Sequence, residues 1–180
     1  MDDRARGGWY SMSGVLTVWA ELSRSVRALD PAQIEAFARA IGNARSVFVT
    51  GLGRSGAVAS AFANRLMHAG LSAHRIGEFT VPAIGDGDLL VAISASGRLL
   101  GGDIALAAGA QVAGVTATAN SPLARAASTT ILIASAGSAQ PMGSLFEQTA
   151  LVALDGVVLD LMTALGQDDG RMRARHANIE

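Results

Sequence analysis

Apolar residues recur at three- and four-residue steps in the first part of the chain, a spacing typical of amphipathic helices. This spacing predicts a helix over about 13–28. Asp30-Pro31 then interrupts the pattern and provides a helix cap, so a second helix is expected from there to about 42. Residues 1–12 contain few apolar positions, and we expect a loose N-terminal segment there.

The rest of the chain alternates short β-rich runs with helical stretches. The predicted strands lie at about 46–50, 73–77, 88–94, 112–116 and 129–133. The predicted helices lie at about 55–69, 98–109, 144–165 and 168–176. Such alternation is typical of α/β domains in which helices cover both faces of a parallel sheet. The 180 residues suit a single domain, with helices at 13–42, an α/β core at 45–165 and a C-terminal helix and tail at 166–180.

The helix predicted at 144–165 carries apolar residues around much of its circumference. A helix of this kind is usually buried on more than one side. We therefore expect the protein to form a homo-oligomer through helices.

Two residue types are missing from the composition. The chain has no Cys, and all 14 of its basic residues are Arg, so it also has no Lys. These absences exclude Schiff-base chemistry, a P-loop lysine, a thiolate nucleophile, disulfides and Cys-bound zinc. A net charge of −1 indicates no basic surface for nucleic acid. Apolar stretches fall short of the roughly 18–20 residues that span a membrane, no signal peptide is evident, and we expect a cytoplasmic protein.

Two loops of small residues follow predicted strands, Thr50–Gly56 and Ser94–Gly97. Each is expected to open a helix, so that backbone N–H groups and the helix dipole point at one place and form an anion site, most commonly for phosphate. Hydroxyl donors come from Ser55, Ser94 and Ser96. Arg54 can add charge there, or can face solvent or a partner subunit. Taken singly, each loop can also be only a tight turn.

The first loop also fits the G-x-G-x-x-G pattern, with Gly51, Gly53 and Gly56. Glu78 falls where an acidic ligand of a ribose would be expected, at the end of the second predicted strand. A dinucleotide site is therefore an alternative. The second loop favours the phosphate interpretation, because a cradle built from two strand ends needs no nucleotide.

Few titratable groups are candidates for proton transfer. Glu147 lies near the start of an apolar helix. It can stabilise the helix through the helix dipole, or it can act as a general base. His176, near the end of the chain, can be solvated or functional, and His68 suits the C-terminal end of its helix. The three His lack metal-ligand spacing, so no metal site is expected.

Several motifs occur together in a familiar order. They are GLGRSG from Gly51, NRLMH from Asn64, PAIGDGD from Pro82, SASG from Ser94, SPL from Ser121, PMGSLFE from Pro141 and RHANIE from Arg175. Over about residues 15–180 the chain resembles the 6-phospho-3-hexuloisomerases of the sugar isomerase (SIS) domain family. The resemblance implies a five-stranded parallel sheet flanked by helices, a flavodoxin-like three-layer sandwich. It also implies dimers or tetramers with active sites near subunit boundaries.

The resemblance further implies interconversion of D-arabino-hex-3-ulose 6-phosphate and fructose 6-phosphate, a step of the ribulose monophosphate pathway, without a cofactor. Glu147 is then the base, and His176, reaching a neighbouring subunit's site, moves protons between oxygens. The residues expected to bind phosphate and sugar are Gly51, Gly53, Arg54, Ser55, Ser94, Ser96 and Gly97. Residues expected to line the site are Arg65, His68 and Glu78.

One position departs from the family pattern S-x-S-G-x-T, because Leu99 stands where the Thr belongs. A hydrogen bond to a charged group is worth roughly 1.5–3 kcal/mol, so losing one hydroxyl at a helix N-terminus is expected to weaken phosphate binding tenfold or more. This departure motivates a second alternative, a protein that binds sugar phosphates without catalysis.

Overall fold

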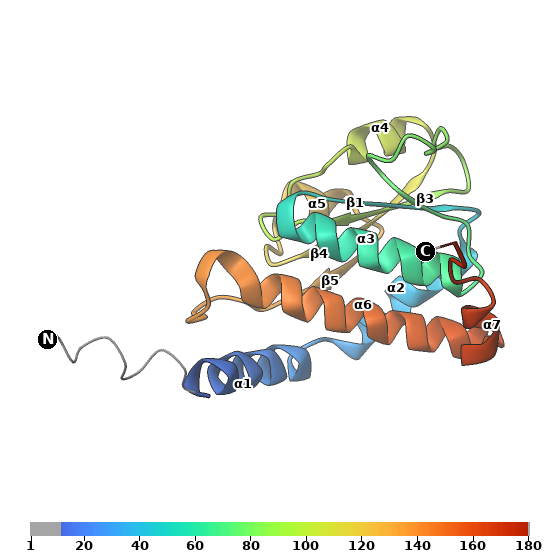
Figure 1. The fold of residues 1–180 in the computed structure, drawn as a ribbon. Coiled ribbons are helices and arrows are strands. Elements are labelled where there is room, and N and C mark those ends of the chain that lie inside the picture. The colour runs from blue at the N-terminus through green and yellow to red at the C-terminus, as the bar shows by residue number, and fades with distance from the viewer. Residues whose placement is uncertain (1–11, 180) are drawn as a thin grey trace, which may run out of the picture.

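The computed structural model describes residues 12–179, whose centre is a five-stranded sheet (Figure 1). The strands are β1 (Val47–Gly51), β2 (Ala73–Arg75), β3 (Leu89–Ile93), β4 (Gln111–Thr116) and β5 (Thr129–Leu132). All pairings are parallel and the order is β2-β1-β3-β4-β5. This is the flavodoxin-like doubly wound order, and it confirms the expected fold class.

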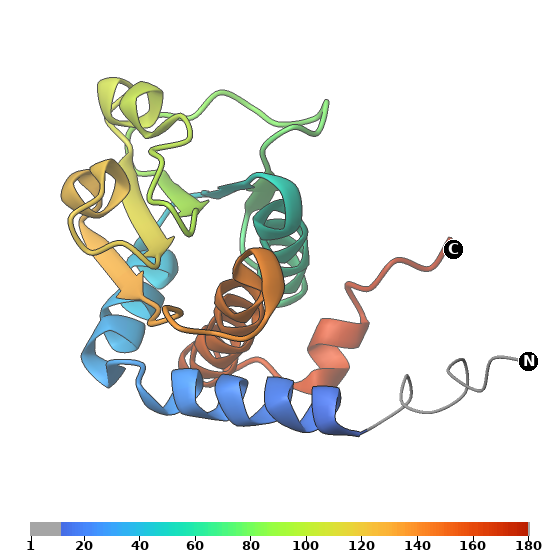
Figure 2. The same ribbon diagram turned by 90° about the vertical axis from the view of Figure 1, so that its left-hand side faces the viewer.

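Helices cover both faces of the sheet. They are α1 (Ser13–Arg27), α2 (Pro31–Asn43), α3 (Gly53–His68), α4 (Gly102–Ala107), α5 (Pro122–Ala126), α6 (Ser144–Ala164) and α7 (Asp169–Arg173), with a 3-10 turn at Pro141–Gly143. α2, α3 and α6 pack on one face, and the short α4 and α5 on the other (Figures 1 and 2). α1 lies outside α6. The loose segment expected at 1–12 falls, apart from Met12, outside the described residues.

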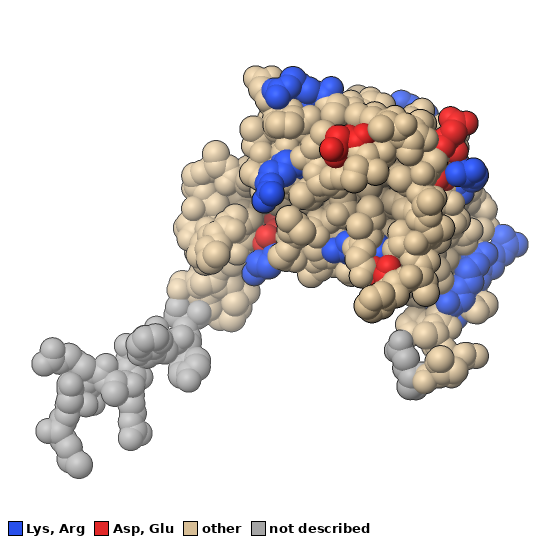
Figure 3. All heavy atoms as spheres, turned by 90° about the horizontal axis from the view of Figure 1, so that it is seen from above, with Lys and Arg blue, Asp and Glu red and all other residues tan. Residues whose placement is uncertain are grey.

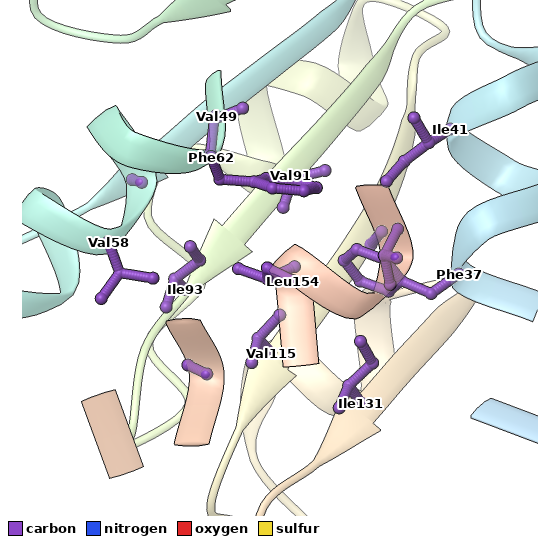
Figure 4. Close-up of a cluster of buried hydrophobic side chains, with 14 of the residues drawn as sticks. Phe37, Ile41, Val49, Val58, Phe62, Val91, Ile93, Val115, Ile131 and Leu154 are labelled. Atoms are coloured by element: carbon purple, nitrogen blue, oxygen red, sulfur yellow. The ribbon is translucent and has the colours of Figure 1, made fainter. Parts of the chain in front are cut away.

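Side chains alternate between two cores along each central strand. In β1, Val47 and Val49 face α2, α3 and α6, whereas Phe48 faces α4 and α5. Figure 4 shows the larger core, in which Phe37 and Phe62 meet the sheet. Because β1 and β3 are buried on both faces, they appear in the sequence as continuous apolar runs.

α6 is apolar on several sides because three helices of the same chain, α1, α2 and α3, pack against it. These contacts account for much of its circumference, but Leu151, Val152 and Leu159 of α6 remain exposed. A second exposed apolar stripe lies on α1: Val15, Leu16 and Trp19, with the N-cap residue Met12, are each more than half exposed. No helix among residues 12–179 is both long and apolar enough to cross a bilayer.

Charged side chains are scattered over the surface. On the face seen in Figure 3, which includes α4, basic and acidic residues are interspersed and neither sign forms a continuous patch. This distribution agrees with the net charge of −1.

Candidate functional site

The strand order reverses between β1 and β3, and this is where both small-residue loops lie. β1 leads to α3 on one face of the sheet and β3 leads to α4 on the other. In parallel sheets, ligands bind outside the carboxyl ends of the strands at such a reversal. Figure 2 looks toward this edge.

The turn after β1 requires glycine for steric reasons. A Cβ on Gly51 would lie 2.5 Å from the carbonyl oxygen of Ser55, and one on Gly56 would lie 2.9 Å from the carbonyl oxygen of Gly51. The chain therefore passes directly into α3, which begins at Gly53 and runs for 16 residues. The first N–H groups of such a helix have no carbonyl partner within it and are available to an anion.

The two loops enclose a cavity of about 250 Å³. It is lined by Leu52, Ser55, Ile93, Ser94, Ala95, Ser96, Arg98 and Leu100. The three serines predicted to act together do line one cavity. Arg98 was missed as a candidate, although its place directly after Ser94–Gly97 was a usable signal. It brings the one cationic side chain among the lining residues.

The expectation that the second loop opens a helix directly is wrong, because α4 begins only at Gly102. The backbone turns left-handed at Gly97 (φ 72°), Leu100 (φ 45°) and Gly101 (φ 83°), which is incompatible with a continuous helix. Ser94 Oγ instead accepts a hydrogen bond of 3.0 Å from the backbone N–H of Arg98. The loop is held against α5, since a Cβ on Gly97 would lie 2.0 Å from the Cβ of Ser121.

Leu99 is consequently not at a helix N-terminus. Its side chain packs against the smaller core, which contains Phe48 and Leu90. The position is thus a packing site and not a helix N-terminus, because α4 starts three residues later. The expected weakening of phosphate binding stays a prediction.

Glu147 lies beside the cavity. It occupies the first turn of α6, where its side chain is 14% exposed and forms an ion pair with Arg54 of α3. Arg54 directly precedes Ser55, which lines the cavity. The structure thus places Arg54 on the candidate base, a pairing that sequence spacing did not indicate. A carboxylate paired with the residue next to this lining serine has the chemistry to take up and return a proton.

The remaining histidine candidates lie at the opposite end of α3. His68 is 4% exposed, and its ring stacks on that of His176 with centroids 5.2 Å apart. Burial lowers the pKa of His68, with smaller contributions from His176 and Arg65. A 1.5 Å rise per residue puts this end about 20 Å from Arg54. Within one chain, then, Arg65, His68 and His176 do not reach the cavity.

Glu78 lines a separate hollow of about 380 Å³, together with Ser60 and Asn64. Between it and the glycine turn lies Arg75, whose Nη2 donates a 3.0 Å hydrogen bond to the carbonyl oxygen of Gly51. Glu78 therefore lines a different hollow from the cavity between the two small-residue loops. Across the described part of the chain, no group of three or more His, Asp or Glu could hold a metal ion.

Comparisons with known proteins show the family of the chain. The SIS domain model matches residues 40–154. The 3-hexulose-6-phosphate isomerase of Mycobacterium gastri is 38% identical, with 89% of this chain and 86% of that protein covered. The enzyme of that name from Bacillus subtilis is 36% identical, with 92% and 97% covered.

A solved structure is also similar. A hypothetical protein of Methanococcus jannaschii, whose structure was taken to infer a 3-hexulose-6-phosphate isomerase function, superposes with a TM-score of 0.82. It is 29% identical, with 93% of this chain and 99% of that chain covered. The glycine turn, the serine-lined cavity and the neighbouring Glu147 therefore belong to a member of the SIS domain family, related in sequence to its 3-hexulose-6-phosphate isomerases.

Proposed function

We propose that the protein is a sugar-phosphate isomerase that interconverts D-arabino-hex-3-ulose 6-phosphate and fructose 6-phosphate in the ribulose monophosphate pathway. The observation that supports this most directly is the position of Glu147. Its carboxylate is paired with Arg54, the residue before Ser55, and Ser55 lines a cavity together with Ser94 and Ser96. The relatives that carry the isomerase name cover most of the chain.

The chemistry needs only groups that this chain has. In the 3-ulose, C3 carries the carbonyl and C2 carries a hydrogen and a hydroxyl. Glu147 removes the C2 proton to give a 2,3-enediol and returns it to C3, while the hydroxyl proton on O2 moves to O3. The carbonyl is then at C2, and no redox step occurs. No cofactor is required for this proton transfer.

The phosphate has a suitable place beside the base. The three serine hydroxyls, the cationic Arg98 and the N-terminus of α3 converge on the cavity. Charge-assisted hydrogen bonds of this type are the strong ones in phosphate binding. Gly51, Gly53 and Gly97 act through the backbone. A Cβ on Gly51 would clash with Ser55 and one on Gly97 with Ser121, while Gly53 has a left-handed φ of 57°.

We further propose that His176 serves the cavity of a second subunit, where it carries the proton between O2 and O3. Its distance from the cavity of its own chain requires this arrangement. The exposed apolar stripe of α1 supports a homo-oligomer. Because the substrate is a phosphorylated intermediate of central metabolism, we expect the enzyme to act in the cytoplasm.

The test is an assay of the purified protein with synthetic hex-3-ulose 6-phosphate, in which fructose 6-phosphate is detected by a coupled enzyme. We expect turnover that requires no added metal or nucleotide. Absence of turnover in correctly folded protein contradicts the proposal.

A second candidate function is non-catalytic binding of sugar phosphates. It is favoured by the loop 94–101, where Leu99 is packed away and the helix begins late. Thermal stabilisation by fructose 6-phosphate without turnover would support it, whereas stabilisation together with turnover supports the isomerase.

A further inference from the structure

The segment that connects β5 to α6 crosses the carboxyl edge of the sheet (Figure 2). It leads into α6, whose first turn contains Glu147. None of the residues from 134 to 144 is buried. The backbone is left-handed at Gly137, Met142 and Gly143, and the Met142 side chain is 97% exposed. The position of this segment is therefore not set by burial of its own side chains.

α1 holds this segment instead. The Glu21 carboxylate accepts hydrogen bonds from Ser138 Oγ (2.6 Å), the backbone N–H of Ala139 (2.8 Å) and Gln140 Nε2 (3.0 Å). Both carboxylate oxygens are used. One turn later, the buried Ser25 donates to the carbonyl oxygen of Ala134 (3.0 Å). The α1 helix is thus attached to the start and to the middle of the exposed segment.

The charge on Glu21 strengthens this attachment. The hydrogen bonds from Ser138, Ala139 and Gln140 lower the pKa of Glu21, so the carboxylate is ionised at neutral pH. Charge-assisted hydrogen bonds are about twice as strong as neutral ones. An amide in place of the carboxylate would present an N–H group to at least one of these donors.

We infer that Glu21 is a positioning residue, which acts through residues 138–140 to set the start of α6 and hence the place of the Glu147 carboxylate beside the cavity. The inference rests on the proposed isomerase function. Gln140 is followed by the Pro141–Gly143 turn, and α6 begins at Ser144. Glu147 lies in the first turn of α6, so a shift in where this helix starts moves its carboxylate. A displacement of about 1 Å at a reacting group can cost about a hundredfold in rate.

The test compares Glu21→Gln with Glu35→Gln. Glu35 is an exposed residue of α2 that pairs with Arg39, far from the segment in sequence and in contacts. We expect Glu21→Gln to lower kcat by about tenfold to a hundredfold, with KM within about twofold because the cavity serines are untouched. Glu35→Gln is expected to match the wild type. Loss of kcat with an unchanged KM distinguishes a misplaced base from general destabilisation.

Ser138→Ala gives a second, milder test, because it removes one donor and leaves the carboxylate in place. We expect a smaller fall in kcat, and a double variant with Glu21→Gln that is no worse than Glu21→Gln alone. Purely additive losses would show that the two residues act separately and would overturn the inference.

Hydrogen exchange of the segment provides a measurement that does not depend on turnover. We expect faster exchange over 134–143 in Glu21→Gln than in the wild type and Glu35→Gln. An active wild type with unchanged kcat in folded Glu21→Gln overturns the inference and leaves the proposed function intact. An inactive wild type overturns the proposed function and the catalytic role of Glu21 with it, whereas faster exchange would still show that Glu21 fixes the segment.

Discussion

The two ends of α3 differ in almost every respect that matters for function. The N-terminal end follows a glycine turn, borders the serine-lined cavity and brings Arg54 to Glu147 of α6. The C-terminal end buries His68 under the ring of His176, and Arg175 donates a 2.9 Å hydrogen bond to the carbonyl oxygen of His68. The N-terminal end leaves backbone N–H groups available to a ligand. At the C-terminal end, the His68 carbonyl has its hydrogen-bond partner within the chain.

The difference follows from helix physics. The N-terminus of a helix has free N–H groups and a partial positive charge, whereas the C-terminus has free carbonyls that attract cations. Arg175 meets the second need without any ligand. Glu147 and His176, which the resemblance joins in one mechanism, can therefore act on one substrate only when they come from two copies of the chain.

The largest expected effect concerns the base at the N-terminal end. Glu147→Gln preserves the shape of the side chain but removes its ability to take a proton. General acid–base groups contribute typically 10²–10⁴-fold, so we expect kcat to fall by roughly that factor with little change in KM. Asp155→Asn, an exposed position on the same helix, is the control and is expected to behave as the wild type. Full kcat in Glu147→Gln would contradict the role of Glu147 as the base, and with it the functional difference between the two ends of α3.

The next effect concerns the C-terminal end of α3, where His176 stacks on His68. His176→Phe keeps an aromatic ring that can stack on His68 but cannot carry a proton, so we expect a fall in kcat of about a hundredfold with little change in melting temperature. Mixing His176→Phe subunits with Glu147→Gln subunits is expected to restore activity, because hybrid oligomers contain one complete site. Full activity of His176→Phe would limit the far end to a structural role.

A smaller effect is expected for phosphate binding. Ser55→Ala removes one hydroxyl from the cavity, and a hydrogen bond to a charged group is worth roughly 1.5–3 kcal/mol, so we expect KM to rise about tenfold. Ser60→Ala, further along α3 in the separate hollow, is the control. Equal changes in the two variants would mean that the cavity at the N-terminal end is not the phosphate site.

The smallest effect is a dependence of stability on pH at the far end. The pKa of His68 is lowered by burial and then by His176 and Arg65, so the unfolded state binds more protons. The stability from neutral His68 is complete above the unfolded value of about 6.5 and is lost as the pH falls below it toward the folded value. Urea unfolding at pH 7 and pH 5.5 should show lower stability at pH 5.5, and less of a difference in His176→Phe. A difference of equal size in both proteins contradicts the role of the His176 charge.

The fold was largely predictable from the sequence. The apolar runs at 88–94 and 46–50 indicated strands buried on both faces, and the structure places β3 and β1 there. Asp30-Pro31 indicated a helix start, and the Asp30 side chain accepts a hydrogen bond from the backbone N–H of Ala32. These signals are local, since they depend on burial and on capping within a few residues.

The parts that were missed depend on contacts between distant residues. The late start of α4 follows from the left-handed backbone at Leu100. A leucine in the sequence does not predict this conformation. The ion pair of Arg54 with Glu147 and the hydrogen bonds of Glu21 join residues about a hundred positions apart. Spacing within a motif carries no information on such pairs. For the same reason, the sequence alone could not show that His176 lies at the opposite end of α3 from the glycine turn.

The most direct test of the central claim, that Glu147 moves a proton between C2 and C3 of the sugar phosphate, is the isomerisation carried out in D2O and followed by NMR. The account predicts that the wild type places deuterium at C3 of fructose 6-phosphate, because the base exchanges part of its proton with solvent, and that Glu147→Gln neither exchanges nor converts the sugar. Deuterium incorporation by Glu147→Gln at the wild-type rate would contradict the claim.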